Sequence, residues 1–252
     1  GQFSSTNVVD FMLRDRANPS SVASGIEAAR ANARLVRTAL TREVWEATNV
    51  CWMALMDALA RPMRESDLPD LLGLVRQQSA LVRGAMHGTM LRNDGYNFAQ
   101  LGTFLERADN TARILDVKYY VLLPSAFQVG SSLDNIQWET ILRSVSAQRA
   151  YRWLNGGEAN PIGIAEFLIL NDQMPRALAF CYAKILDDLG HLAEQYGART
   201  VCHDLAARIH ARLQERPIQE IFDSGLHEFI QAFIRESNAV SAQLQIDYRF
   251  QG

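Results

Sequence analysis

Hydrophobic side chains recur every three or four residues along the segment from Phe98 to Leu123, and this spacing constrains the fold more than any other feature of the sequence. Residues at that spacing lie on one side of an α-helix, which has about 3.6 residues per turn. The segment therefore predicts a long helix with one buried face, closed by Pro124. The predicted inward residues are Phe98, Leu101, Leu105, Ala108, Ala112, Leu115, Tyr119 and Leu122.

A polar stripe follows the same helix beside its apolar face, within about a third of the circumference. Ordinary surface ion pairs, worth about 0.2–0.5 kcal/mol each, would explain the charges, and a functional site would explain them too. A glycine within a helix costs about 1 kcal/mol relative to alanine, so Gly102 indicates either close approach of another helix or room for a ligand beside Glu106. Arg107 and Lys118 are expected on the far side. The stripe consists of Gly102, Glu106, Asp109, Asn110, Arg113 and Asp116.

Segments with helical periodicity cover most of the chain, and the alternation typical of strands is nearly absent. The sequence therefore predicts an all-α protein, a multi-helix bundle of about eight to nine helices with mostly antiparallel neighbours. No linker divides it, so residues 1–252 are expected to form a single domain. Ser20 or Ser21, and Thr41, are the expected caps of the first two helices. The expected helices are 20–40, 41–60, 66–91, 98–123, 134–154, 161–170, 172–190, 199–214 and 218–248.

Charge and composition exclude several classes of protein. The net charge is −3, which argues against a nucleic-acid-binding surface, and no apolar run approaches the ~20 residues of a membrane span. The odd, widely spaced cysteines favour a reducing, cytoplasmic location over a disulfide framework. No metal, nucleotide or nucleophile signature occurs, so no metal or other cofactor is expected, and an enzyme is less expected than a non-catalytic protein.

Two further clusters are candidate sites. Arg30, Arg34 and Arg37 share one face of the first predicted helix, where arginine favours recognition of carboxylate or phosphate. Trp45, Glu46 and Asn49 lie within little more than one turn, where they either line a cleft or represent a core tryptophan with solvated neighbours.

His227 is a candidate acid/base group because histidine titrates near neutral pH, although a hydrogen-bonded structural role explains it as well. Cys181, in an apolar stretch, is expected in the core, and Cys202 and His203, adjacent on a helix, are not expected to form a dyad. The sequence thus leaves Glu106 and His227 as the catalytic candidates.

Residues Leu105–Tyr120 resemble the second "ER" motif of the alpha-E family, a group of all-helical bacterial proteins named for that motif. Other blocks that resemble the family appear in order over most of the chain. They are Asn18–Arg37, Glu43–Asn49, Ser146–Trp153, Ala165–Cys181 and Gly225–Phe233. Family members usually begin with an earlier ER-containing helix, and that segment is expected to be missing before Gly1.

The resemblance implies a helical partner or scaffold in a bacterial peptide-ligating or peptide-modifying system. Family members are typically encoded beside circularly permuted ATP-grasp ligases and transglutaminase-like proteins, so these, or a carboxylate-bearing peptide, are the expected partners; a homo-oligomer is also possible. The expected binding residues are Glu106, Arg107, Asp109, Arg113, Arg30, Arg34, Arg37, Trp45, Glu46 and Asn49. The alternative is an enzyme of the same system, with Glu106 as acid/base and Arg107 and Arg113 as anion-binding groups.

Overall fold

The computed structural model describes residues 4–61, 64–121, 132–156 and 160–250. These residues form twelve α-helices, two short 3-10 helices and no strand, which confirms the all-α prediction. The chain divides into two compact units, residues 1–96 and 97–252. Two compact units can still fold together as one domain, so the single-domain interpretation stays a prediction. None of the helices in the described ranges is both long enough and apolar enough to cross a membrane.

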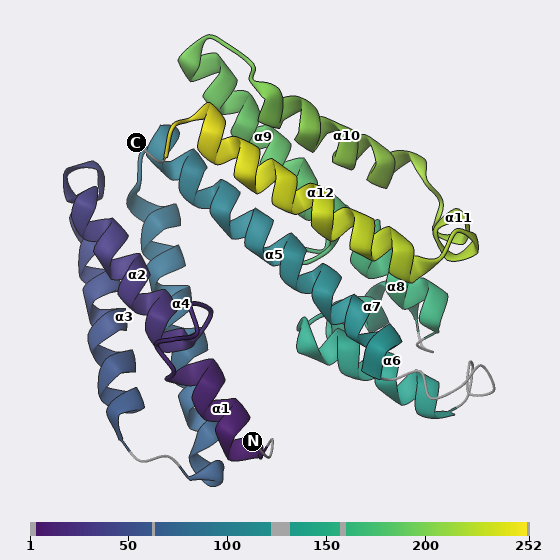
Figure 1. Ribbon diagram of the computed structural model, residues 1–252, viewed down its shortest axis with the longest axis horizontal. Coiled ribbons are helices and arrows are strands. Elements are labelled where there is room, and N and C mark those ends of the chain that lie inside the picture. The colour runs from purple at the N-terminus through teal and green to yellow at the C-terminus, as the bar shows by residue number, and fades with distance from the viewer. Residues whose placement is uncertain (1–3, 62–63, 122–131, 157–159, 251–252) are drawn as a thin grey trace. The chain divides into compact units, whose positions relative to one another are not determined.

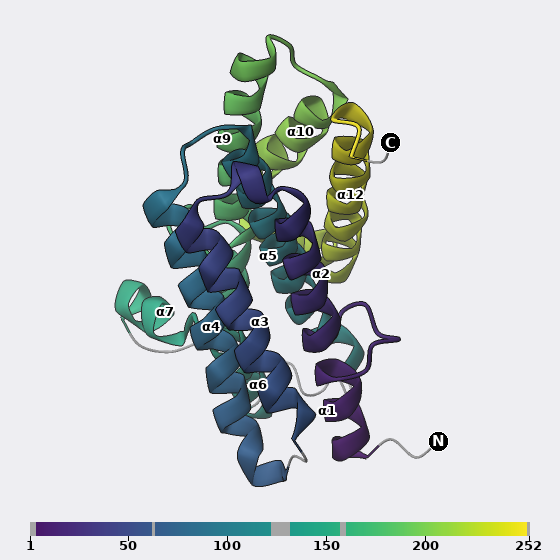
Figure 2. The same cartoon turned by 90° about the vertical axis from the view of Figure 1, so that its left-hand side faces the viewer.

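The first unit is built on three antiparallel helices, α2, α3 and α4 (Figure 2). Ala23 at the start of α2 packs with Leu59 at the end of α3 and Leu71 at the start of α4. The hydroxyls of Thr41 and Thr89 lie 2.6 Å apart, at the start of α3 and the end of α4. The elements are α1 (Ser5–Leu13), α2 (Val22–Leu35), η1 (Arg37–Ala39), α3 (Arg42–Ala60), η2 (Glu65–Asp67) and α4 (Leu68–Thr89).

Side-chain caps begin α2 and α3, as the sequence predicts. The Ser21 hydroxyl accepts the Ser24 N–H at 3.2 Å, and the Thr41 hydroxyl accepts the Val44 N–H at 3.4 Å. The predicted extension of α2 to residue 40 is wrong, because α2 ends at Leu35. Leu40 has an extended backbone, which leads into the capping residue Thr41. Arg37 therefore lies outside α2, in η1.

The second unit contains most of α5 and seven later helices. In Figure 1, α5 and α12 run side by side, and α10 packs against both α12 and α9. The elements are α5 (Asp94–Val121), α6 (Ser132–Ser144), α7 (Gln148–Asn155), α8 (Pro161–Ile169), α9 (Leu178–Tyr196), α10 (Val201–Glu215), α11 (Ile218–Asp223) and α12 (Leu226–Asp247).

The predicted inward face of α5 lies in the large core of the second unit. Leu101, Leu105, Ala108, Ala112 and Leu115 are buried, and Phe98 packs against them. The side chains of the other two predicted members, at positions 119 and 122, lie outside the described residues. So does nearly all of the predicted polar connection, 125–132.

Lys118, which the sequence places on the far side of α5 from the polar stripe, is buried. Its ammonium group donates to Gln137 Oε1 at 2.6 Å and lies 5.7 Å from the centre of the Trp138 ring. Phe104 and Thr111 are buried on the same side of α5. The helix thus buries a second face.

The helix count exceeds the prediction because left-handed backbone breaks two of the expected helices. The segment 134–154 divides into α6 and α7 near Ser146, whose φ is +56°, and 218–248 divides into α11 and α12 at Gly225, whose φ is +96°. Residues 171–177 form a turn, in which Asn171 Oδ1 accepts the N–H groups of Gln173 and Met174, so α9 begins later than predicted. Helix α1 was not among the predicted helices.

Candidate functional site

Three residues of α3 form a stripe that faces α2: Trp45, Asn49 and Trp52. The Asn49 amide nitrogen donates to the Trp45 carbonyl oxygen at 2.9 Å, which fixes the amide. Its oxygen then accepts the Nε–H of Arg30 at 2.9 Å, so Asn49 links the two helices.

Two arginines lie over the tryptophan rings at the ends of this stripe. The guanidinium carbon of Arg30 is 4.1 Å from the Trp52 ring centre, and that of Arg37 is 5.1 Å from the Trp45 ring centre. Such cation–π contacts contribute about 0.5–1 kcal/mol at exposed sites. Arg34 is exposed and has no hydrogen bond or ion pair within the described part of the chain.

The structure therefore brings together candidates that the sequence placed in two separate clusters. Glu46 does not join them, because it pairs with Arg42 at 2.6 Å along α3. That hydrogen bond raises the pKa of Arg42. Sequence reasoning missed Trp52, although its position seven residues after Trp45 places it on the same side of the helix. We call the resulting surface the α2–α3 face: Arg30, Arg34, Leu35, Arg37, Trp45, Asn49 and Trp52.

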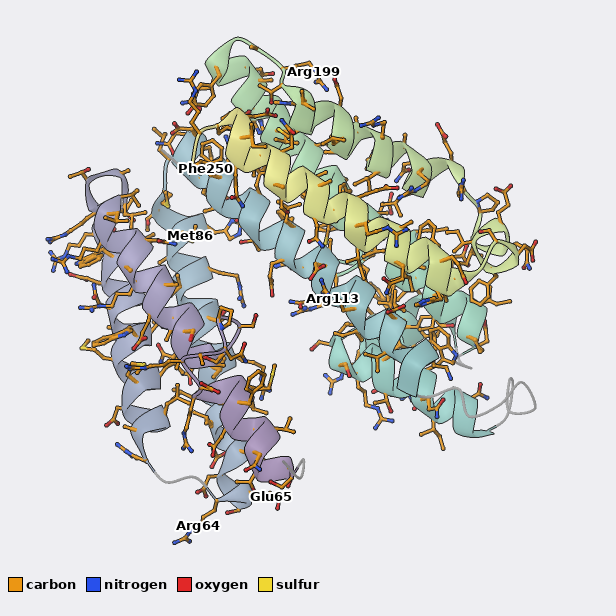
Figure 3. All side chains as sticks on the ribbon, viewed as in Figure 1. Arg64, Glu65, Met86, Arg113, Arg199 and Phe250 are labelled. Carbon is orange, nitrogen blue, oxygen red and sulfur yellow. The ribbon has the colours of Figure 1, made fainter. Side chains whose placement is uncertain are left out.

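On α5, the predicted polar stripe is mostly a solvated helix surface. Glu106 is exposed and accepts a hydrogen bond from the Asn110 amide of its own helix. Asp109 and Arg113 form an i,i+4 ion pair at 2.7 Å, and this hydrogen bond raises the pKa of Arg113. Figure 3 shows Arg113 projecting from α5. Asp109 and Arg113 thus form the i,i+4 pair that their spacing predicts.

Arg107 points away from the stripe and ties α5 to the turn before α9. It donates to the Pro175 carbonyl oxygen at 3.2 Å, and its guanidinium carbon lies 5.2 Å from the Phe104 ring centre. The Glu and Arg of the predicted ER motif thus contact different parts of the unit.

A groove of about 430 Å³ runs between α5 and α12, and its lining combines charged and polar side chains with a larger apolar surface. A Cβ added to Gly102 would meet no neighbouring atom within 4 Å, so close helix packing does not explain this glycine. Oδ1 of Asp109 is buried and has no hydrogen-bond partner among the described residues. The other explanation for Gly102 that the sequence suggested, room for a ligand beside Glu106, agrees with the presence of this groove. It is lined by Phe98, Gly102, Leu105, Glu106, Asp109, Ser237, Asn238, Ser241, Leu244, Gln245 and Phe250.

At the other end of α12, His227 contacts Asp116, a member of the predicted polar stripe on α5. The carboxylate of Asp116 lies 2.6 Å from His227 Nδ1 and accepts the Gln231 amide at 2.7 Å. Asp116 is buried, so these two bonds fix α12 against α5. They also orient the imidazole, as an acid/base role and a structural role both require.

The three cysteines are buried free thiols. Burial raises the pKa of Cys181 to about 12 and that of Cys202 to about 11, so both are protonated and unreactive near neutral pH. His203 Nδ1 accepts the Thr200 N–H at 3.0 Å, and its Nε2 donates to the Leu189 carbonyl at 2.9 Å, which assigns this histidine a structural role. In the described ranges, no three His, Cys, Asp or Glu side chains cluster as a metal site would require.

The fold and these surfaces define a class: an all-helical domain with charged helix faces. A family model, described as Alpha-E, "a predicted alpha-helical domain with a conserved ER motif", matches residues 1–248. The chain therefore belongs to the Alpha-E family. Comparisons with curated proteins and with solved structures found no match.

Proposed function

We propose that this protein is a non-catalytic helical partner of an amide-forming enzyme, and that the α2–α3 face docks an ATP-grasp ligase. One observation carries the proposal: within the described chain, Arg30, Arg34 and Arg37 form no ion pair with a carboxylate. The carboxylates of an acidic partner would supply the missing counter-charges.

Apolar side chains on the same surface support docking. Leu35 is 84% exposed, and Met53, one turn beyond Asn49 on α3, is 53% exposed. Interfaces combine such apolar contacts with arginine and tryptophan, the residues that most often dominate binding energy. A transglutaminase-like protein is the other partner that we would test.

The experiment is a calorimetric titration of the protein with the ATP-grasp ligase encoded nearest to it. We expect micromolar or tighter association that weakens about ten-fold or more when Arg34 and Arg37 are both changed to Glu. Arg83→Glu is the matched control, because Arg83 is exposed on α4 and contacts Ser79 of its own helix. Full affinity in the double variant, or no association with wild-type protein, would contradict the proposal.

The second candidate function is an enzyme, which the contact between Asp116 and His227 favours. The version with Glu106 as acid/base has less support, because Arg113 already pairs with Asp109 and Arg107 donates to Pro175. A product formed by the protein without any ligase, and lost in His227→Gln, would establish the enzyme instead.

The proposed location is the cytoplasm. Its reducing conditions suit the free thiols of Cys51, Cys181 and Cys202, and an ATP-dependent partner would find its nucleotide there.

A further inference from the structure

The α2–α3 face contains a pocket of about 560 Å³ at the C-terminal half of α2. Two of its walls differ in character: Arg30 and Arg34 contribute guanidinium groups, whereas Leu35 and Trp52 contribute apolar surface. Glu27 and Ala31 complete the lining.

Arg30 is held in place by contacts that leave the end of its guanidinium group available. Its Nε–H is bound by Asn49, and the plane lies over Trp52. Neither Nη atom has a hydrogen-bond partner among the residues that the structure describes. A guanidinium fixed in this way presents two parallel N–H groups at little further cost in side-chain entropy.

The local charge is positive although the pocket contains an acid. Glu27 pairs with Arg16 at 2.6 Å, so its charge is balanced. Arg30 and Arg34 have no such counter-charge in the described ranges, and they leave a surplus of two positive charges at the pocket.

We propose that this pocket binds the carboxylate of a peptide, with Arg30 as the bidentate partner and an apolar group of the peptide against Leu35 and Trp52. A carboxylate has two oxygens at the spacing of the two N–H groups. The apolar wall suits a peptide carboxylate better than a phosphate, which is more strongly hydrated. The proposal deepens the proposed function, on which it rests for its biological role, by naming the chemical group that the α2–α3 face recognises.

The test is an NMR titration of the isolated protein with N-acetyl-leucine, which carries an apolar side chain beside its carboxylate. N-acetyl-leucinamide, which lacks the carboxylate, is the matched probe. We expect the amide to bind about ten-fold more weakly or worse, with the wild-type shifts centred on Arg30, Arg34 and Trp52. Equal binding of the two probes would overturn the proposal.

Variants of Arg30 distinguish the effect of its two parallel N–H groups, the fork, from the effect of its positive charge. Arg30→Gln should weaken binding of N-acetyl-leucine about ten-fold, and Arg30→Lys should weaken it several-fold because lysine keeps the charge and loses the fork. Arg83→Gln removes a charge from the same unit and should leave binding within about two-fold. Unchanged binding in both Arg30 variants would overturn the proposal, and their far-ultraviolet circular dichroism establishes that they are folded.

Two further probes identify the source of the carboxylate. Acetyl-Leu-Glu-amide carries only a side-chain carboxylate, so a preference for it over N-acetyl-leucine would assign the pocket to an internal acidic residue, and the reverse to a chain terminus. Either preference supports the proposal. Tighter binding of inorganic phosphate than of both carboxylates would overturn it.

The result is independent of the docking experiment because no ligase is present. If the protein binds the carboxylate probe but does not associate with the ligase, the proposed function is overturned and the proposed carboxylate pocket stands. If the ligase still associates with the Arg30→Gln variant and the wild-type protein binds no carboxylate probe, the proposed carboxylate pocket is overturned and the proposed docking of the ligase on the α2–α3 face stands.

Discussion

Gly102 and Gly225 both lie in or beside helices of the second unit, yet their surroundings are opposite. Gly102 has open space where a Cβ would lie. Gly225 has a φ of +96°, and an added Cβ would overlap Glu228 Oε2. The same substitution should therefore change stability in opposite directions at the two positions.

Gly102→Ala should raise the free energy of unfolding by about 0.5–1 kcal/mol, because alanine restricts the unfolded chain and meets no neighbour here. Gly225→Ala should lower it by about 1–3 kcal/mol, because the left-handed backbone is strained for alanine and Glu228 must move. Urea denaturation followed by circular dichroism measures both. A change of the same sign in the two variants would contradict this account.

Asp188 on α9 predicts a pH dependence of stability. It is 8% exposed, Oδ2 has no partner in the described chain, and burial raises its pKa to about 6 from 3.8. The folded state thus favours the protonated acid, so this contribution to stability is fully present below pH 3.8 and is lost as the pH rises through 6.

Asp188→Asn should consequently be more stable than wild type at pH 7, by on the order of 1–3 kcal/mol. The difference should shrink as the pH falls and vanish near pH 4. Urea denaturation of both proteins between pH 4 and 7 measures it. A difference that is constant with pH would show that burial of this carboxyl group does not raise its pKa.

At the scale of single elements, Asp116 rather than Glu106 makes the hydrogen bonds that link α5 to α12. Asp116→Ala removes the acceptor of two bonds from α12 and leaves His227 and Gln231 without this partner, so we expect a loss of about 2–4 kcal/mol. Glu106→Ala, on the same helix, should stay within about 0.5 kcal/mol because Glu106 is exposed. Thermal unfolding measures both; equal losses would restore Glu106 as a structural residue.

The long helices could be predicted from sequence because apolar periodicity and hydroxyl caps are local signals. Leu101 to Leu115 illustrate the first, and Ser21 and Thr41 the second. The divisions at Ser146 and Gly225 could not, because a positive φ at one residue leaves the surrounding periodicity intact.

The candidate sites were predicted only in part, for a different physical reason. Spacing identifies which residues share a helix face. It grouped Trp45 with Asn49, which are hydrogen-bonded, but also with Glu46, which pairs with Arg42 instead. Contacts between helices, such as Arg30 with Asn49 and Asp116 with His227, depend on how the helices pack. A buried lysine is also hidden from sequence reasoning, because the partners of Lys118 come from another helix.

At the scale of the whole molecule, the two units differ in how much core they contain. The second unit has one large buried cluster, to which most of its helices contribute. The first unit has two small clusters, and the 22 residues of α4 contribute a single buried residue, Leu71.

Hydrogen–deuterium exchange should therefore be faster in α2, α3 and α4 than in α5, α9 and α12, because local opening is easier where less apolar surface is buried. Mass spectrometry of peptic fragments measures this directly. Equal protection over both units would instead show that the chain unfolds as the single domain that its sequence predicts.

Under the proposed function, as the partner of an amide-forming enzyme, the burial of Lys118 has a chemical consequence. The chain has two lysines, and Lys118 is enclosed against Trp138. The other lysine, Lys184, is half-buried, and Asp187 holds its ammonium group at 2.9 Å. Arginine supplies nearly all of the positive surface charge, and its guanidinium group is a poor nucleophile towards an activated carboxylate. Such a surface can attract carboxylates while offering almost no lysine side chain to be acylated in place of the true acceptor.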